Sequence, residues 1–234
     1  MSRRALMLSF VLALSASLLA TLPLRLILGA RSGFDPGALD LSVADASGSI
    51  WSGRLRSVDW RGQSLGDVSV ALDPVALLTG VLGLRLEMSG FSVGLLRGRR
   101  DGIDHANGEL HLAMKDLPGV AVRLSLADAS LLFANGRCRS AGGTVQAVVT
   151  GIGPPVRVSG PVRCDGENGS ITLASVPGPG VRRVEAHLVI DGDGRYELRS
   201  LVQSADGMSA LALRAAGFEL TPMGLARTDR GQLY

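Results

Sequence analysis

Apolar and polar residues alternate with a period of two along most of the chain after residue 32. The clearest runs are residues 84–89, 109–114, 120–127 and 196–199. A strand with one apolar and one polar face produces this alternation, because successive side chains point to opposite faces. Residue pairs typical of tight turns separate the runs: Arg61-Gly62, Asn107-Gly108, Asn135-Gly136, Asp165-Gly166 and Asp191-Gly192-Asp193-Gly194. The pattern predicts a meander of antiparallel strands.

The number of strands bears on the architecture of the sheet. About ten to twelve such runs follow the N-terminal segment, and most have a single apolar face. A sheet of this kind must cover its apolar face by closing, folding over or stacking. We therefore predict a mainly β fold, with a curled, U-shaped or half-barrel antiparallel sheet.

One segment between two predicted strands has a different pattern and predicts a single short helix. Asp73 can cap this helix, and Pro74 suits its first position. Gly80 or Gly83 can end it. The resulting helical turn would lie across the sheet or at its open end.

The N-terminus carries the longest apolar run of the chain. Arg3 and Arg4 precede an uncharged stretch over residues 5–24, which as a helix would span about 30 Å, the thickness of a bilayer core. This pattern is either a cleaved signal peptide or a retained anchor. Leu18 and Leu28 stand where a cleavage site needs small residues, which favours an uncleaved transmembrane helix. The arginines favour a cytoplasmic N-terminus and place the remaining chain outside the cytoplasm.

These observations predict two regions. Residues 1–30 form a cytoplasmic tip and membrane anchor, and residues 31–234 form one β domain. The stretch 151–163 is rich in Gly and Pro, so it is either a loop between strands or a soft division of that domain. The similar strand pattern on both sides favours one continuous sheet.

Composition and motifs exclude several classes of function. Hydrophobic residues make up 46% of the chain but aromatic residues only 4%, and the net charge is +3. Nucleic-acid binding usually needs a basic face with interleaved aromatic residues, so we predict none. The three histidines lack the spacing of metal ligands, and no nucleophile elbow or phosphate-binding glycine loop is present. We predict no catalytic site, no metal site and no cofactor.

Cys138 and Cys164 are the only cysteines. In an oxidising compartment an even count favours a disulfide, whereas in the cytosol the pair would be two reduced thiols. The predicted anchor favours the oxidising side, and we predict the bond.

The two tryptophans, Trp51 and Trp60, lie in the predicted first strand pair, where their large side chains would either anchor a hairpin in the core or contact a partner or lipid. Two short motifs are found in this region. The first consists of Gly48, Ile50, Trp51 and Gly53, and the second of Pro74, Leu77 and Leu78. Together they resemble the signature hairpin and the Pro-x-x-Leu-Leu element of protein N of the type II (general) secretion system. The clear resemblance covers residues 40–90, and the pair Cys138 and Cys164 is similar to the cysteine pair of many members.

The resemblance implies a single N-terminal membrane helix, a periplasmic β domain and a cell inner-membrane location. It also implies a non-enzymatic function, in which the protein binds other secretion subunits through a sheet surface or edge. The same segment resembles, more loosely, the β-groove repeats of AsmA-type envelope proteins. That similarity implies an alternative function, in which an apolar groove binds or transfers lipid.

Overall fold

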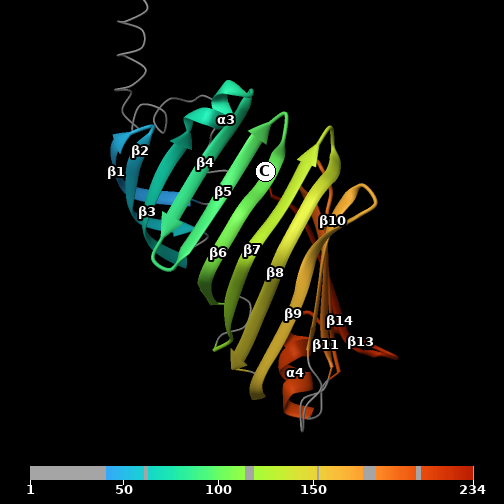
Figure 1. Ribbon diagram of the computed structural model, residues 1–234. Helices are drawn as coiled ribbons and strands as arrows, with labels where there is room; N and C mark the ends of the chain where they lie inside the picture. Colours follow the sequence, from blue (N-terminus) through green and yellow to red (C-terminus); the bar gives the residue numbers. More distant parts are fainter. Residues whose placement is uncertain are drawn as a thin grey trace, which may run out of the picture. The chain divides into compact units, whose positions relative to one another are not determined.

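The computed structural model describes residues 41–60, 63–113, 119–151, 153–175, 183–203 and 207–233. Strands dominate these residues (Figure 1). They are β1 (Leu41–Ser49), β2 (Ser52–Trp60), β3 (Gln63–Asp73), β4 (Val81–Met88), β5 (Phe91–Gly98), β6 (Asp101–Ala113), β7 (Ala121–Ala134), β8 (Arg137–Gly151), β9 (Gly153–Asp165), β10 (Asn168–Ser175), β11 (Val184–Ile190), β12 (Arg195–Val202), β13 (Glu219–Thr221) and β14 (Gly224–Gln232). Two short helices, α3 (Pro74–Leu78) and α4 (Gly207–Ala215), complete the described elements.

The described strands form a single open antiparallel sheet of 14 strands. They follow one another in sequence order from β1 to β12, after which β14 precedes β13. The predicted mainly β meander is therefore confirmed. The curled, U-shaped or half-barrel form of the whole sheet stays a prediction. The chain divides between Ser89 and Gly90 into two compact units.

The first unit contains β1 to β4 and α3. Its strands alternate as predicted: in β4, Leu84, Leu86 and Met88 are half-buried on one face, while Arg85 and Glu87 are exposed on the other. Apolar side chains of β2 and β3 form a buried cluster of Leu55, Val58, Val68 and Val70. Val58 is only 2% exposed, and further apolar residues of β1, β3 and β4 pack against the cluster. One face of these strands is thus a small core, and the other is polar.

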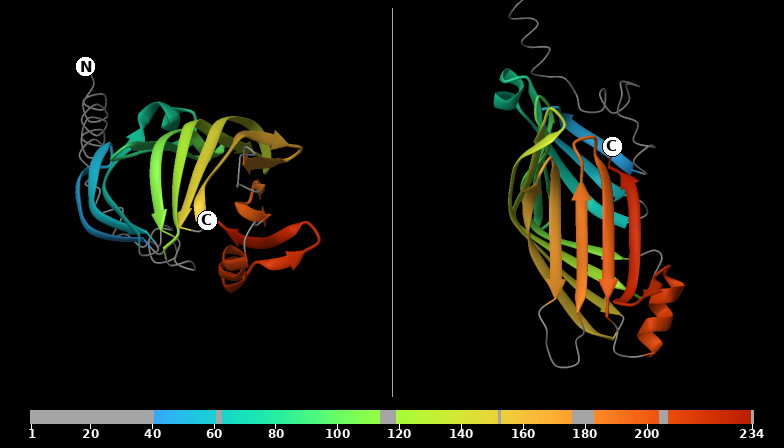
Figure 2. Two further views of the ribbon diagram at one scale, coloured as in Figure 1. Left: turned by 90° about the horizontal axis from the view of Figure 1, so that it is seen from below. Right: turned by 90° about the vertical axis from the view of Figure 1, so that its right-hand side faces the viewer.

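The second unit contains β5 to β14 and α4. Its buried apolar residues also lie on alternate positions, such as Ala129, Leu131 and Phe133 of β7. Helix α4 contacts β14, seen in Figure 2, and the Arg227 guanidinium of β14 donates a 2.7 Å hydrogen bond to the Ala216 carbonyl just beyond the helix. This contact is made near the end of the sheet order, where β14 and the short β13 follow β12.

Helix α4 corrects the prediction of one short helix. Its sequence, GMSALALRA, alternates small and larger apolar residues in a way that imitates a strand. Ala, Leu, Met and Arg are nevertheless among the strongest helix formers, so local propensity favours a helix here. Leu213 and Ala216 are buried, whereas Leu211 is exposed, so one side of this segment packs against the rest of the protein and the other faces solvent.

A set of bulges interrupts the alternation in the second unit and corrects a predicted turn. Asn107 and Gly108 lie inside β6 rather than between two strands. The register of β6 against β7 shifts on both sides of Ala106, and that of β7 against β8 shifts between Ala127 and Ser130. A bulge needs the same residue types as a turn, because both favour a positive φ. At Gly108, where φ is +114°, a Cβ would lie 2.0 Å from the Gly90 carbonyl oxygen.

Three other predicted turns are confirmed. Residues 135–136 join β7 to β8, residues 166–167 join β9 to β10, and residues 191–194 join β11 to β12. The turn at Arg61-Gly62 lies outside the described residues. The Gly/Pro-rich stretch near 151–163 largely forms β9, which pairs with β8 and β10.

The predicted transmembrane helix lies outside the described residues, as does the boundary at residues 30–31. Within the described ranges, no helix combines the length and hydropathy that a membrane span requires.

Candidate functional site: signature hairpin, short helix, polar hollow and disulfide

The signature residues lie at the hairpin between β1 and β2. Gly48 and Gly53 face each other across this hairpin. The φ of Gly48 is +89°, and a Cβ added there would lie 2.5 Å from the Ser52 carbonyl oxygen. A residue with a side chain would therefore meet both a strained backbone and a steric clash at this position. Gly53 is buried in β2.

Ile50 and Trp51 form the turn itself, and their burial differs from the prediction. Ile50 is 7% exposed and belongs to the core, whereas Trp51 is only half-buried. The core anchor of this turn is thus Ile50 and not Trp51. The Ile50 carbonyl also accepts a 3.2 Å hydrogen bond from the backbone N–H of Leu72, near the end of β3. This bond links the signature turn to the start of α3.

Helix α3 is built as the sequence predicts. The Asp73 carboxylate accepts hydrogen bonds from the backbone N–H groups of Val75, at 2.9 Å, and Ala76, at 3.3 Å. Pro74 occupies the first helical turn, and Gly80, at φ +75°, follows the end of the helix. None of the helical residues is buried, and Leu78 is 88% exposed. The Pro-x-x-Leu-Leu element therefore does not fill the core of its unit.

A hollow of about 510 Å³ opens on the polar side of the first unit. It is lined by Ser47, Gly48, Ser52, Gly53, Arg54, Arg56, Ser69, Val70, Ala71, Arg85 and Glu87. It contains two of the signature residues, Gly48 and Gly53, together with three arginines and one glutamate. Sequence reasoning missed the hollow, because its lining comes from four strands whose register the sequence does not state.

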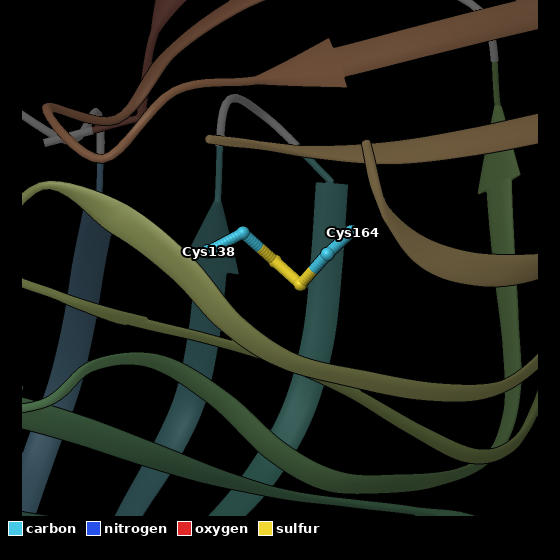
Figure 3. The surroundings of a disulfide bond; sticks show 2 residues. All are labelled: Cys138 and Cys164. Atoms are coloured by element: carbon cyan, nitrogen blue, oxygen red, sulfur yellow. A yellow bond between two sulfur atoms is a disulfide. The ribbon is translucent and has the colours of Figure 1, made fainter. Parts of the chain in front are cut away.

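The disulfide lies in the second unit. Cys138 of β8 and Cys164 of β9 are joined, and their Cα atoms are 5.6 Å apart (Figure 3). Two further contacts connect the same segments. The Cys138 backbone N–H donates a 2.7 Å bond to the Glu167 carbonyl, and the Arg137 guanidinium lies 3.0 Å from the Glu167 carboxylate. The predicted bond thus fastens the β7–β8 turn region to the β9–β10 turn.

Comparison with known proteins identifies the family. The family model described as Type II secretion system (T2SS), protein N, matches residues 40–222. The chain belongs to this family. The match begins just before β1 and ends after β13, so it contains the signature hairpin, α3, the hollow and both cysteines. Corresponding comparisons with curated proteins and with solved structures gave no match.

Membership of the protein N family makes this chain a component of the type II secretion system. The sequence resemblance to this family was clear for residues 40–90, and the family match extends it through most of the second unit. Among the described residues, no three His, Cys, Asp or Glu side chains gather as ligands of a metal ion. The absence of a catalytic site stays a prediction for this chain.

One polar cluster in the second unit was not predicted from the sequence. His105 of β6 and Asp128 of β7 both have positive φ values, 49° and 50°, at the bulges described above. The His105 Nδ1 lies 2.5 Å from an Asp128 carboxylate oxygen. Asn107 accepts a 2.8 Å bond from the Asp128 backbone N–H through its side-chain oxygen. The cluster therefore holds two adjacent bulges together.

The charge of this cluster is pH-dependent. The hydrogen bond to Asp128 raises the pKa of His105 above its ordinary value of 6.5, and the charges of Asp104 and Asp128 add to this rise. All three side chains contact solvent, since His105 and Asp128 are exposed and Asp104 is half-buried. Among the described residues, no nucleophilic side chain is hydrogen-bonded to this cluster, so its geometry fits a structural pair at a strained backbone better than a catalytic pair.

Proposed function

We propose that this protein is an inner-membrane-anchored, periplasmic component of the type II secretion machinery that binds other subunits and catalyses no reaction. The observation that carries the proposal is the family match over residues 40–222. The arginines and the apolar run at the N-terminus support the anchor and its orientation. The disulfide supports an oxidising compartment such as the periplasm.

The edge strand β1 supports binding through an exposed sheet edge. This nine-residue strand ends the sheet order, and β2 is its single neighbour among the described strands. An edge of this length presents unpaired backbone N–H and C=O groups to which a partner strand can add. The opposite end of the order is the three-residue β13, which offers fewer such groups.

A photo-crosslinking amino acid at Asp45 tests this proposal. Asp45 is exposed on β1, and the matched control position, Ser159, is exposed on β9 between two neighbouring strands. In cells that assemble the machinery, we expect crosslinks to other secretion subunits from position 45 and none from position 159. Deletion of the gene should reduce export of folded proteins across the outer membrane. Normal export in the deletion strain, with no crosslink to a secretion subunit, would refute the proposal.

The location has its own test. A reporter enzyme that is active only outside the cytoplasm, fused after residue 234, should be active. Activity of a cytoplasm-restricted reporter at the same position would contradict the orientation. The lipid-binding groove of the AsmA-like type stays an alternative prediction.

A further inference from the structure

The polar hollow of the first unit owes its shape to side-chain size. On the polar face of β3, Ser69 and Ala71 are small and form its floor. The strands on either side carry long side chains: Arg54 pairs across with Ser69, and Arg85 pairs across with Ala71. Neighbouring strands lie about 4.8 Å apart, so a column of small residues between columns of arginines leaves a depression with cationic walls.

The charges of the hollow are strongly unbalanced. Arg54, Arg56 and Arg85 face it with a single carboxylate, Glu87. Among the described residues, none of these three guanidinium groups has an ion-pair partner. Asp45 lies across from Arg56 in register, but it does not line the hollow and forms no ion pair with it. Three arginines that share one hollow thus keep their donors available.

The positions of the arginines allow them to reach one ligand. Arg54 and Arg56 are alternate residues of β2, so their Cα atoms are about 6.7 Å apart on the same face. Arg85 is two strands away, which is about 10 Å, and its side chain extends from the far side of the same floor. Arginine presents a planar fork of donors that matches a phosphate group, and the hydroxyls of Ser47, Ser52 and Ser69 add further donors.

We propose that this hollow binds a phosphate group through Arg54, Arg56 and Arg85. Its volume of about 510 Å³ lies within the range of small-molecule sites, about 300–1,000 Å³. An extended acidic peptide is a poorer fit, because its carboxylates would be distributed along a strand rather than gathered in one depression. Two sources present the required chemistry, free phosphate and the headgroup of a phospholipid.

The neighbouring α3 favours the lipid source. The helix follows β3 directly, three residues beyond Ala71, and its Val75 and Leu78 side chains are exposed. Apolar side chains next to a cationic hollow are typical of surfaces that meet a lipid headgroup and the adjoining acyl region. The site does not depend on the proposed secretion function and can be tested separately from it.

Calorimetric titration of the full chain, in a phosphate-free detergent buffer with 150 mM NaCl, tests the proposal. The probes are inorganic phosphate, glycerophosphoethanolamine as a soluble headgroup, glycerol as its phosphate-free counterpart, and hexaglutamate as an acidic peptide. A phosphate-bearing probe should bind, and the double variant Arg54→Gln/Arg85→Gln should lose at least about tenfold in affinity, since hydrogen bonds to charged groups are strong. Arg157→Gln, at an exposed arginine of β9, is the matched control and should bind as the wild type does.

The variant Glu87→Gln gives a second test, because it should increase the affinity for phosphate where the arginine variants decrease it. Glu87 is the one carboxylate in the lining, and for an assumed charge separation of about 7 Å at a water-like dielectric constant its removal should tighten phosphate binding by about threefold. Tighter binding of the headgroup than of inorganic phosphate assigns the site to phospholipid, and the reverse order assigns it to free phosphate.

Three results would overturn the proposal. They are no binding of either phosphate probe at millimolar concentration, undiminished binding by the double variant with an unchanged melting temperature, or tighter binding of hexaglutamate through the same arginines.

Discussion

Removal of the Cys138–Cys164 bond should destabilise the second unit by an amount that the loop length sets. The bond joins positions 26 residues apart. In the chain-entropy model a crosslink of this span removes unfolded-state entropy worth about 3.5 kcal/mol at 25 °C. For a protein of this size, about 1 kcal/mol corresponds to 2–4 °C, so the melting temperature should fall by roughly 7–14 °C.

The folded structure indicates that this loss of stability comes from the greater entropy of the unfolded chain and not from broken contacts in the folded one. Without the bond, the Cys138 backbone N–H still donates to the Glu167 carbonyl, and Arg137 still pairs with Glu167. These contacts hold the same two segments together in the folded protein. Cys138 is 8% exposed, so alanine is the better replacement there, because a buried serine hydroxyl without a partner would add its own cost of about 1–3 kcal/mol.

The assay is urea unfolding of the full chain in mild detergent, followed by far-ultraviolet circular dichroism. The variants are Cys138→Ala, Cys164→Ala and the double variant. All three lose the same crosslink, so their free energies of unfolding should agree within about 0.5 kcal/mol, and reduced wild type should match them. The reasoning is wrong if the double variant unfolds within about 1 kcal/mol of oxidised wild type. It is also wrong if reduced wild type stays as stable as the oxidised form.

Substitutions at three residues and one pH titration test other parts of the structure. Gly48→Ala should destabilise the first unit by about 2 kcal/mol or more, measured by tryptophan fluorescence during unfolding, because φ is +89° and a Cβ meets a backbone carbonyl. Asp73→Ala should cost about 1 kcal/mol through the lost cap of α3, whereas Asp73→Asn should largely keep it. Since the hydrogen bond to Asp128 raises the pKa of His105, the pair should stabilise the folded protein fully below pH 6.5, and this stabilisation should be lost as the pH rises through the raised pKa. An NMR titration that gives His105 a pKa at or below 6.5 would contradict this. Leu78→Ser should change stability by less than about 0.5 kcal/mol, because Leu78 is 88% exposed, and a larger loss in thermal melts would show a hidden packing role.

The strands could be predicted from the sequence because alternation is a local property. Residues 84–88 show the predicted pattern, with Arg85 and Glu87 exposed and the residues between them more buried. The short helix was equally readable, since Asp73 and Pro74 act within one turn of each other. A prediction of this kind needs only neighbouring residues and no knowledge of the register.

The bulges show where local reading fails. In β7 the more buried positions are even-numbered from Val122 to Leu126 and odd-numbered from Ala129 to Phe133, so the phase changes at Asp128. This slip is visible in the sequence, but it does not distinguish a turn from a bulge, because both suit residues that tolerate a positive φ. Asn107-Gly108 was predicted as a turn for this reason. The choice is made by pairing partners in other strands, such as the Asp128 N–H that donates to Asn107.

The hollow could not be predicted from the sequence, because it depends on how four strands pair. Arg54, Arg56 and Arg85 each read as an ordinary solvated position on the polar side of a strand. Their convergence requires the pairing of Arg54 with Ser69 and of Arg85 with Ala71 across β3. A shift of one residue in either pairing would place these side chains on opposite faces. The sequence therefore shows that these three arginines are present, but the strand register is needed to show that they line one hollow.

The structure also separates the signature residues into two kinds. Gly48 and Ile50 are explained by folding, because one avoids a clash at a positive φ and the other fills the core while its carbonyl holds Leu72. Leu78 has no such explanation, since it contacts mainly solvent in a helix that buries nothing. Replacement of Leu78 should leave the stability of the fold almost unchanged, yet Leu78 belongs to a family motif. We therefore expect it to act by contacting something other than the folded chain itself. The hairpin thus positions α3, and the exposed part of α3 is where a function separate from stability should be sought.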